Sequence, residues 1–351
     1  MMSSTTRYTR LNFRETAVAI LAVLFLVSLQ TCHCQWIKHA GNPVMPLSDD
    51  GWDNLTIHAA SVIKDGEAYV MWYSATNGVS SGIGMAESPD RIQWTRYGHN
   101  PLIINGSNSY DARYIFAPCV IRDEEGYKIW YTGSDADYIW TINLATSQDG
   151  VLWEKHPQNP VLKPGPEWYD TERVGDPWVV YNDGQYEMWY TCQSRPEITY
   201  GIGYAASEDG IHWVKHPDPV LLAADSGPDS GTVRDACVIR VESGYEMWYR
   251  GIEGRNWTIC HATSSNGVDW SRNPQNPVLQ GESGSWDERV WFPRVLVEED
   301  RYSMWFASAE FNEIGYAYLP VAELSVPVAA TIIAWILGLL HYHDAGFTDS
   351  G

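Results

Sequence analysis

The stretch GDPWVVYNDGQYEMWY at residues 175–190 is typical of two short strands joined by a tight turn. An apolar run precedes Asp183-Gly184, a hairpin signal, and an alternating run follows that ends in Met-Trp-Tyr. The same pattern occurs four more times in the chain. The repeat is therefore an internal control, because residues shared by all copies serve the fold and residues found in one copy are candidates for function.

Five tryptophans mark the repeat at intervals of 58, 59, 59 and 57 residues, and each stands ten residues after a valine. The pairs are Val62 and Trp72, Val120 and Trp130, Val179 and Trp189, Val238 and Trp248, and Val295 and Trp305. Such a period indicates a repeat architecture. Each pair is followed by an alternating strand, a tight turn and the start of another strand, as in IGYAASEDGIHW at 202–213. One unit is therefore four antiparallel strands, the size of a β-propeller blade.

The fifth unit ends at residues 314–319 and lacks its last strand. Residues 36–44, WIKHAGNPV, have the tryptophan-to-proline spacing of three internal copies, so they can complete the fifth blade. Closing the ring in this way leaves no open sheet edge. We predict an all-β fold, a five-bladed β-propeller of four-stranded antiparallel blades over residues 35–320, closed by the N-terminal strand.

Composition narrows the classes of partner. Of the 351 residues, 44% are hydrophobic, which is ample for a large core. With 44 acidic and 23 basic residues the formal net charge is −21, which repels phosphate backbones. Nucleic acid is therefore not an expected partner.

Two apolar segments flank the repeats. Residues 1–34 contain arginines followed by an apolar run at 16–29, the layout of a signal peptide or signal anchor. Within the C-terminal segment 321–351, residues 324–340 carry no charge and are just long enough to span a membrane. This segment is either a membrane anchor or a terminal packing helix. We expect a secreted or cell-surface protein, with membrane attachment through this segment left open.

Cysteines and sequons add little that is specific. Four cysteines lie within the repeats: Cys119, Cys192, Cys237 and Cys260. Export would permit disulfides in three alternative pairings, and none of the spacings is that of a metal site. Glycosylation sequons begin at Asn54, Asn105 and Asn256.

Aligning the copies on their valines gives HAASV, FAPCV, GDPWV, RDACV and WFPRV at the start of the first strand. An aspartate about nine residues earlier occurs in every copy, which predicts a structural role for Asp53, Asp111, Asp170, Asp229 and Asp287. Asp176 and Asp235 instead replace Ala59, Ala117 and Phe292 of the other copies. First strands converge at the mouth of a propeller channel, where neighbouring carboxylates acquire different pKa values. Asp176 and Asp235 are therefore catalytic candidates, unless they only bond a neighbouring blade.

Other residues specific to one blade gather at the same mouth. We predict substrate contacts from His58, Arg113, Arg173, Arg234, Arg250, Glu253, Arg289 and Trp291. Glu172, Arg195, Glu197, Glu288 and Glu310 join them, and Trp140, Trp178 and Trp257 are out of register with the repeated tryptophans, which we expect to pack between blades. Arginines, carboxylates and indoles suit a polyhydroxylated ligand. A solvated ring of salt bridges is the alternative.

With these motifs the chain resembles the five-bladed propeller enzymes of glycoside hydrolase families 43, 32 and 130. The resemblance covers almost all of residues 36–319 and rests on the MWYTG-like triplets, the SEDGIHW-type turns, the NPVL ends and the GDP and RDA strand starts. It implies a base or nucleophile at Asp176, a pKa-tuning aspartate at Asp235 and a general acid at Glu288 or Glu253. Calcium in the channel near His58 is implied by the resemblance alone, and the residues themselves indicate no cofactor.

The first two blades depart from family 43, because Ala59 and Cys119 stand where that family has its base and its pKa-tuning aspartate. Either the site is rotated by two blades or it is lost and the protein only binds glycans. Family 130 phosphorylases have a similar Glu-Asp-Pro start, and Arg113, Arg173 and Arg234 are candidate phosphate ligands. The sequence thus predicts an exported glycoside hydrolase acting on oligosaccharides or polysaccharides, with a glycan-binding propeller or a phosphate-dependent phosphorylase as alternatives.

Overall fold

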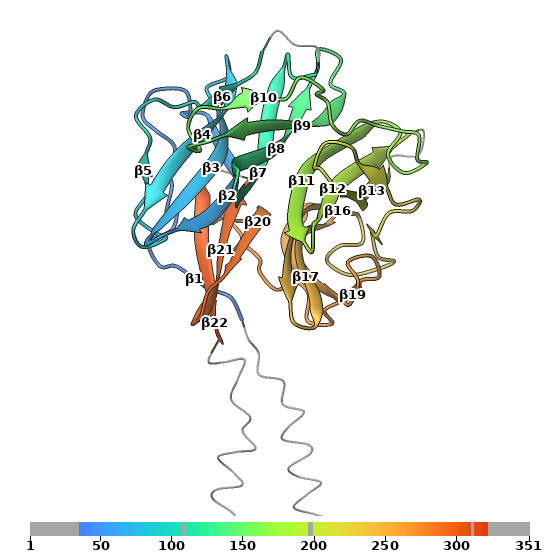
Figure 1. Ribbon diagram of the computed structural model, residues 1–351. Helices are drawn as coiled ribbons and strands as arrows, with labels where there is room; N and C mark the ends of the chain where they lie inside the picture. Colours follow the sequence, from blue (N-terminus) through green and yellow to red (C-terminus); the bar gives the residue numbers. More distant parts are fainter. Residues whose placement is uncertain (1–34, 107–109, 196–198, 310–311, 322–351) are drawn as a thin grey trace, which may run out of the picture. The chain divides into compact units, whose positions relative to one another are not determined.

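The computed structural model describes residues 35–106, 110–195, 199–309 and 312–321, and the compact unit Gln35–Leu319 contains five antiparallel sheets (Figure 1). The predicted all-β, five-bladed propeller is confirmed. The first strand of each blade is buried along most of its length, because neighbouring sheets cover both of its faces. The first strands are therefore apolar in the middle, and polar residues appear at their ends.

The five blades follow one another in chain order. Blade 1 has β2 (Thr56–Asp65), β3 (Ala68–Thr76), β4 (Ser81–Ser88) and β5 (Thr95–Arg96), with β6 (Ile103–Ile104) beside β4. Blade 2 has β7 (Tyr114–Asp123), β8 (Gly126–Ser134), β9 (Trp140–Ser147) and β10 (Glu154–Lys155). Blade 3 has β11 (Arg173–Asn182), β12 (Gln185–Ser194), β13 (Thr199–Ser207) and β14 (Val214–Lys215), with β15 (Leu221–Leu222) beside β13. Blade 4 has β16 (Thr232–Val241), β17 (Gly244–Glu253), β18 (Asn256–Ser264) and β19 (Ser271–Arg272). Blade 5 has β20 (Val290–Val297), β21 (Arg301–Ser308), β22 (Ile314–Pro320) and β1 (Ile37–Lys38).

The N-terminal strand closes the ring as predicted. Strand β1 pairs antiparallel with β22, with Ile37 opposite Tyr318, so the fifth blade has its fourth strand from the other end of the chain. Lys38 adds an ion pair to the buried carboxylate of Asp287, with Nζ and Oδ2 2.5 Å apart. Chain closure therefore reproduces inside blade 5 the contacts that the other blades make locally.

The aspartate shared by all copies is structural, as predicted, but its role is an ion pair rather than a turn. Each of the five is buried and pairs with a basic side chain of the outermost strand in its own blade. The pairs are Asp53–Arg96, Asp111–Lys155, Asp170–Lys215, Asp229–Arg272 and Asp287–Lys38. Each pair ties the entrance of the first strand to the rim of its sheet.

The repeated tryptophans pack between blades, which confirms their predicted role. The indoles of Trp72, Trp130 and Trp189 each donate to a glycine carbonyl in the turn of the following blade. Each ring also meets, edge to face, a tryptophan from the following blade, with centroids 6.3 to 6.4 Å apart. Trp36 makes the same contact with Trp248 at 6.1 Å, so the N-terminal segment completes the tryptophan series as well.

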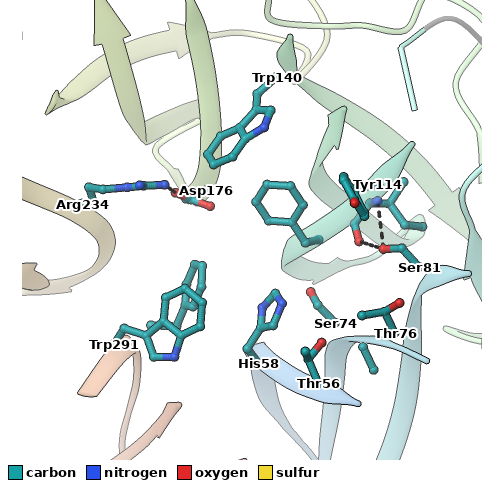
Figure 2. Close-up of a pocket in the computed structure, with 14 residues that line it drawn as sticks. Thr56, His58, Ser74, Thr76, Ser81, Tyr114, Trp140, Asp176, Arg234 and Trp291 are labelled. Atoms are coloured by element: carbon teal, nitrogen blue, oxygen red, sulfur yellow. Dashed lines mark hydrogen bonds and ion pairs between the residues drawn. The ribbon is translucent and has the colours of Figure 1, made fainter. Parts of the chain in front are cut away.

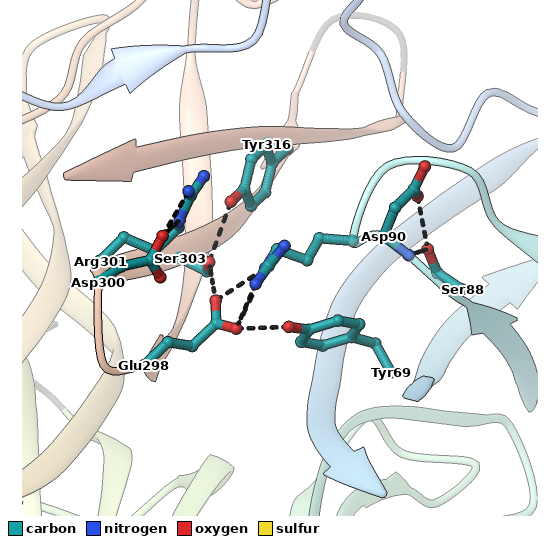
Figure 3. Close-up of polar contacts among 9 residues, drawn as sticks. Tyr69, Ser88, Asp90, Glu298, Asp300, Arg301, Ser303 and Tyr316 are labelled. Atoms are coloured by element: carbon teal, nitrogen blue, oxygen red, sulfur yellow. Dashed lines mark hydrogen bonds and ion pairs between the residues drawn. The ribbon is translucent and has the colours of Figure 1, made fainter. Parts of the chain in front are cut away.

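A polar cluster joins blade 5 to blade 1 at the end of β20 (Figure 3). We call Tyr69, Arg91, Glu298, Ser303 and Tyr316 the Glu298 cluster. Glu298 accepts from Arg91 at 2.7 and 2.9 Å, from Ser303 at 2.6 Å and from the Tyr69 hydroxyl, and Ser303 also contacts the Tyr316 hydroxyl. Burial would raise the pKa of Glu298, but these hydrogen bonds outweigh it and the pKa is lowered. The last interface of the ring is therefore held by a fully bonded carboxylate.

The structure also bears on the cysteines and the chain ends. All four cysteines of the described residues are buried and free, so none of the three predicted pairings forms. Cys119 and Cys237 each accept a backbone N–H at 3.2 Å, from Val179 and Val295 of following blades. No helix in the described part of the chain is long and apolar enough to cross a membrane. The signal-like residues 1–34 and the apolar run at 324–340 lie outside the described residues.

Candidate active site at the channel mouth

Every first strand bends at the same position. The residues at this bend are Ala59, Ala117, Asp176, Asp235 and Phe292, and all have left-handed backbone with φ between 47° and 56°. Pairing with the second strand slips at each of them, which is a β-bulge. The propeller thus requires the bend in every blade but a carboxylate in none. The bend itself therefore serves the fold, and the blades differ in the residue that occupies it.

The bend also shows which residue of blade 2 is equivalent to Asp176. In blade 2 the residue equivalent to Asp176 is Ala117, not Cys119. Cys119 lies two residues further along β7 and points its sulfur at the next blade. The first two blades therefore both carry alanine where blades 3 and 4 carry aspartate.

A hydroxyl from the preceding blade holds the bend in three of the five strands. Ala117 N donates to Ser74 Oγ at 2.8 Å, Asp176 N to Thr132 Oγ1 at 2.8 Å and Asp235 N to Thr191 Oγ1 at 3.1 Å. The equivalent position in blade 4 is Arg250, whose guanidinium turns to Asp235 instead, with Nε and Oδ2 2.9 Å apart and Nη2 and Oδ1 3.3 Å apart. Blades 1 to 3 thus have a hydroxyl at this position that bonds the bend of the next blade. Blade 4 has Arg250 there, which forms an ion pair with Asp235 of its own blade.

Asp176 and Asp235 form a buried pair of carboxyl groups on adjacent blades. Both side chains are fully inaccessible to bulk solvent. Burial raises the pKa of Asp235 to about 6; Arg250 opposes the rise, and the charge of Asp176 and its hydrogen bond to Asp235 add to it. The Asp235 carboxyl group therefore retains a proton at weakly acidic pH.

Of the two carboxyl groups, only that of Asp176 lines a cavity. Its Oδ2 lies 3.4 Å from Arg234 Nη2, while its Oδ1 is buried and has no partner among the described residues. A buried carboxylate oxygen without a partner is costly, so such an oxygen is expected to meet a ligand or an ordered water.

Two guanidinium groups flank the indole of Trp140 beside this pair. Arg173 and Arg234 stand over its ring at 5.2 and 5.4 Å, and the Nε of each is buried without a partner. Burial would lower the pKa of Arg234, but Asp176 and Asp235 outweigh it and the pKa is raised. Burial lowers the pKa of Arg250 to about 10 even though Asp235 opposes this. Arg234 and Arg250 therefore remain cationic at neutral pH.

A cavity of about 300 Å³ opens in front of Asp176 (Figure 2). Asp176 and Arg234 lie at one end, and Thr76, Ser81 and Tyr114 lie at the other. Aromatic rings form the middle of its wall, from Phe116, Trp140, Trp291, Phe292 and His58. Apolar walls with a few convergent polar groups are characteristic of small-ligand sites.

His58 lies between the two ends. Burial lowers its pKa to about 4, so the imidazole is neutral at physiological pH, and its Nδ1 is buried and unpartnered. Its ring stacks on Phe292 at 5.5 Å and lies 5.4 Å from Trp291. Calcium requires several oxygen ligands, and these aromatic neighbours do not provide them. No group of three acidic, histidine or cysteine side chains in the described residues is placed to hold a metal ion, and we derive no role for calcium.

The structure brings together most of the predicted site residues. His58, Asp176, Arg234 and Trp291 line the cavity, Asp235 and Arg250 lie next to Asp176, and Arg173 lies beside Trp140. Trp257 is packed on Trp291 with Arg250 and Arg289 over its ring, and Trp178 donates to Val238 O as an inter-blade contact.

Four predicted residues lie away from the cavity. Glu288 is exposed and accepts the N–H of Gly284 in its own loop at 2.9 Å, and Glu253 is exposed at the end of β17. Arg113 is exposed and stacks on Tyr138 at 3.9 Å, and Arg289 stacks on Trp257. Neither proposed general acid is among the residues that line the cavity. Glu197 and Glu310 lie outside the described residues.

The sequence missed the far end of the cavity. Its residues come from blades 1 and 2, namely Thr56, Ser74, Thr76, Ser81, Tyr114 and Phe116. The alignment already contained a signal for two of them, because Thr56 and Tyr114 stand six residues before their valines, at the same position as Arg173. Small and hydroxylated side chains carry no sequence signal of a binding site, because they are common in strands and loops.

Comparison with known proteins points to glycan-acting enzymes. Residues 61–202 match the model of the glycosyl hydrolases family 32 N-terminal domain, and residues 193–305 match the model described as β-1,4-mannooligosaccharide phosphorylase. An uncharacterized protein of Mycobacterium tuberculosis is 28% identical over 221 residues, covering 58% of this chain and 72% of that protein. The 1,2-β-oligomannan phosphorylase of a Thermoanaerobacter species is 25% identical over 177 residues, covering 47% and 59%.

Solved structures share the fold. The β-1,2-mannobiose phosphorylase of Listeria innocua, in complex with β-1,2-mannobiose, superimposes with a TM-score of 0.67 at 14% identity, covering 82% of this chain and 97% of that one. A glycosyl hydrolase of Bacteroides ovatus gives 0.65 at 13% identity, covering 81% and 92%. These structures confirm the propeller fold, and the two family-model matches bear out the resemblance to families 32 and 130 over the residues that they cover. Together, the fold and the family matches support a glycan-acting enzyme.

Proposed function

We propose that the protein cleaves glycosidic bonds of oligosaccharides at the channel mouth, with Asp176 as the carboxyl group that faces the reacting bond. One observation carries this proposal. Asp176 presents an unpartnered buried oxygen to the cavity from a bend that alanine occupies in two other blades. The fold does not require a carboxylate at this bend, so we assign the carboxylate of Asp176 to the ligand of the cavity.

The Asp176–Asp235 pair supplies the proton that glycosidic cleavage requires. Burial raises the pKa of Asp235 to about 6, and the charge of Asp176 adds to the rise, so the Asp235 carboxyl group holds a proton in weakly acidic solution. Asp176, which lines the cavity, passes it to the glycosidic oxygen as the bond from the anomeric carbon breaks. Asp235 and Arg250 then set the acidity of the pair without touching the sugar.

The arginines favour phosphate over water as the attacking group. Arg173 and Arg234 converge on Trp140 with unpartnered donors, an arrangement suited to an anion. A phosphate oxygen would bond to the anomeric carbon as the leaving oxygen takes the proton, giving a sugar 1-phosphate and a shortened saccharide. The match of residues 193–305 to a phosphorylase model supports this assignment.

Hydrolysis is the second candidate, with Asp176 as base for an attacking water. It would need a separate acid on the opposite side of the sugar. Glu288 and Glu253 do not line the cavity, so neither is favoured as that acid. The match of residues 61–202 to a hydrolase model keeps this alternative in view.

Mannosides are the first substrates to try, because the matched phosphorylase model and relatives are named for them. We would incubate the full-length protein with β-1,2- and β-1,4-mannooligosaccharides, with and without phosphate, and quantify mannose and mannose 1-phosphate. Asp176→Asn should abolish turnover. Asp183→Asn is a matched control, since Asp183 is an exposed left-handed aspartate in the hairpin of the same blade.

The outcomes separate the alternatives. Product that requires phosphate identifies a phosphorylase, and free mannose without phosphate identifies a hydrolase. Binding without turnover that Asp176→Asn leaves unchanged identifies a glycan-binding propeller. We also propose that the protein acts outside the cell, supported by the signal-like segment 1–34, and N-terminal sequencing of material from a producing culture tests this.

A further inference from the structure

The cavity has a second arm that leads away from Asp176. Beyond the aromatic middle, its wall passes to β2, β3, β4 and β7, at the contact between blades 1 and 2. Figure 2 shows this separation, with Asp176 and Arg234 on one side and Ser81, Thr76 and Tyr114 on the other. We call the part lined by Thr56, Thr76, Ser81 and Tyr114 the outer arm.

We propose that the outer arm holds the sugars that follow the reacting one, so that a neutral glycan chain leaves Asp176 across blades 1 and 2 and chains longer than a disaccharide are preferred. This proposal rests on the proposed function, because it places the reacting bond at Asp176. It adds the direction of the chain and the charge of the sugars.

The chemistry of the outer arm is that of a neutral ligand. None of the side chains that blades 1 and 2 contribute to the cavity is charged, since the only titratable groups among them are Tyr114 and the neutral His58. Hydroxyl-rich and aromatic walls suit sugar hydroxyls and the apolar faces of sugar rings. The charged side chains that line the cavity itself, Asp176 and Arg234, belong to blades 3 and 4.

Three polar atoms along this path are free. Thr56 Oγ1, His58 Nδ1 and Trp291 Nε1 are buried and have no partner among the described residues. Other hydroxyls of the outer arm are occupied, because Ser81 Oγ donates to Ile115 O at 2.7 Å and Thr76 Oγ1 donates to Ser80 O at 2.6 Å. The free atoms need partners that the protein does not provide, and sugar hydroxyls can both donate and accept.

An exposed apolar rim continues from the outer arm. Tyr114 lines the cavity and is 41% exposed, and Arg113 stacks both on it and on Tyr138, which is 46% exposed. Tyr138 has left-handed backbone at φ 63°, in a turn held by Asp135. The loop between β3 and β4 adds Val79, which is 92% exposed. Aromatic side chains held out at a cavity mouth are suited to stacking on sugars beyond the buried ones.

Filling the outer arm tests the proposal. Thr56→Trp introduces an indole there and breaks no hydrogen bond of the folded protein, because Thr56 Oγ1 has no partner. Thr232→Trp is the matched control: Thr232 occupies the same position in blade 4, bonds its hydroxyl to Gly231 O and does not line the cavity. Thr56→Val is a second variant, which removes only the free hydroxyl.

We would measure kcat/KM of the full-length protein for β-1,2- and β-1,4-linked mannobiose and mannotetraose. Thr56→Trp should lower kcat/KM for the tetraose at least tenfold and change the value for the biose less than threefold. Thr56→Val should lower it for the tetraose several-fold, and Thr232→Trp should change neither. Equal losses for both lengths, or no loss for either, would overturn the proposal.

Direct binding separates this proposal from the proposed function. Calorimetric titration of Asp176→Asn, with and without Thr56→Trp, follows a panel of neutral tetrasaccharides including manno-, gluco- and xylo-oligosaccharides. Weaker tetrasaccharide binding in the double variant supports the outer arm even if no substrate is turned over. Turnover with no dependence on chain length rejects the outer arm and leaves the proposed function standing. Failure of every tetrasaccharide to bind rejects the outer arm too.

Discussion

The Glu298 cluster and the channel mouth both bury charged groups, but they treat them in opposite ways. In the Glu298 cluster, each carboxylate oxygen of Glu298 accepts two hydrogen bonds or more, and no buried polar side-chain atom of its five residues lacks a partner. At the mouth, Asp176 Oδ1, Arg234 Nε, His58 Nδ1 and Trp291 Nε1 are buried without one. Both regions are polar, and they differ in whether their buried polar atoms have hydrogen-bond partners.

The difference separates charges that hold the fold from charges that wait for a ligand. A fully bonded buried carboxylate stabilises the native state and costs stability when it is removed. An unpartnered one costs stability while it is present, and it is retained where it does chemistry. Substitutions in the two regions should therefore have opposite effects on stability and activity.

Asp176→Ala should have the largest effect. It gives blade 3 the residue that blades 1 and 2 already carry at the same bend, at Ala59 and Ala117. We expect turnover to fall about a thousandfold, the usual range for loss of an acid–base group, while the free energy of unfolding changes by less than about 1 kcal/mol or rises. Steady-state kinetics and urea unfolding measure the two quantities.

The corresponding control for this first prediction is Asp170→Ala, in the same blade. Asp170 is buried and paired with Lys215, so its removal should reduce stability, because Lys215 loses its counter-charge. If Asp176→Ala instead unfolds the protein as Asp170→Ala does, Asp176 is structural and the comparison between the two regions fails.

Glu298→Gln should have the next largest effect, on stability alone. The amide keeps the shape of Glu298 but loses the charge that binds Arg91, so we expect a loss of about 2 kcal/mol in the free energy of unfolding. The kinetic constants of the folded enzyme should not change, because the Glu298 cluster lies outside the cavity wall. A Glu298→Gln variant as stable as the wild type would contradict the assignment of this cluster to ring closure.

The sequence predicted the features of the molecule that repeat from blade to blade. Period, strand pairing and closure by Trp36 follow from spacing, because a blade must bury the same positions each time. Asp176 and Arg250 also stood out, because each breaks a series of five. Directions of loops do not repeat, so spacing could not place Glu288, which lies before β20 in a turn where it accepts the N–H of Gly284.

Two features of the site can be recognised only in the three-dimensional structure. The left-handed bend at Asp176 has no sequence signature, because alanine, aspartate and phenylalanine all occupy it. The outer arm is lined by small residues such as Thr56 and Ser81, and only the geometry distinguishes a free hydroxyl from a bonded one. Sequence reasoning finds unusual residues readily and misses ordinary residues in unusual places.

The pH dependence of stability should have opposite signs in the two regions. Folding raises the pKa of Asp235 from about 3.9 to about 6, so its contribution to stability is full below the lower value and is lost as pH rises through the higher one. Folding lowers the pKa of Glu298, so its contribution is present at neutral pH and is lost as pH falls. Urea unfolding between pH 3 and 8, on the order of the range these pKa values cover, measures both slopes.

Asp235→Asn isolates the first of these slopes. We expect it to flatten the change in stability between about pH 4 and 6 and to leave the acid limb intact, whereas Glu298→Gln should flatten the acid limb alone. Activity provides a second readout, since the wild type should lose turnover above about pH 6 as the pair loses its proton. An unchanged profile in Asp235→Asn would show that Asp235 does not share a proton with Asp176.

Arg173→Met should have the smallest effect, and it tests whether the unpaired cations of the mouth wait for an anion. Arg173 stacks on Trp140 and has no carboxylate closer than Glu172, 4.0 Å away, so methionine preserves much of the packing and leaves no strongly paired charge behind. We expect the KM for phosphate to rise about fivefold to tenfold, the loss of one charge-assisted hydrogen bond, with kcat and stability almost unchanged. Arg195→Met is the control, because Arg195 binds the other carboxylate oxygen of Glu172 in an exposed pair. Equal effects of the two variants would mean that Arg173 serves Glu172 rather than phosphate. Arg173 would then be a structural charge, like those of the Glu298 cluster, and not a ligand-binding group of the mouth.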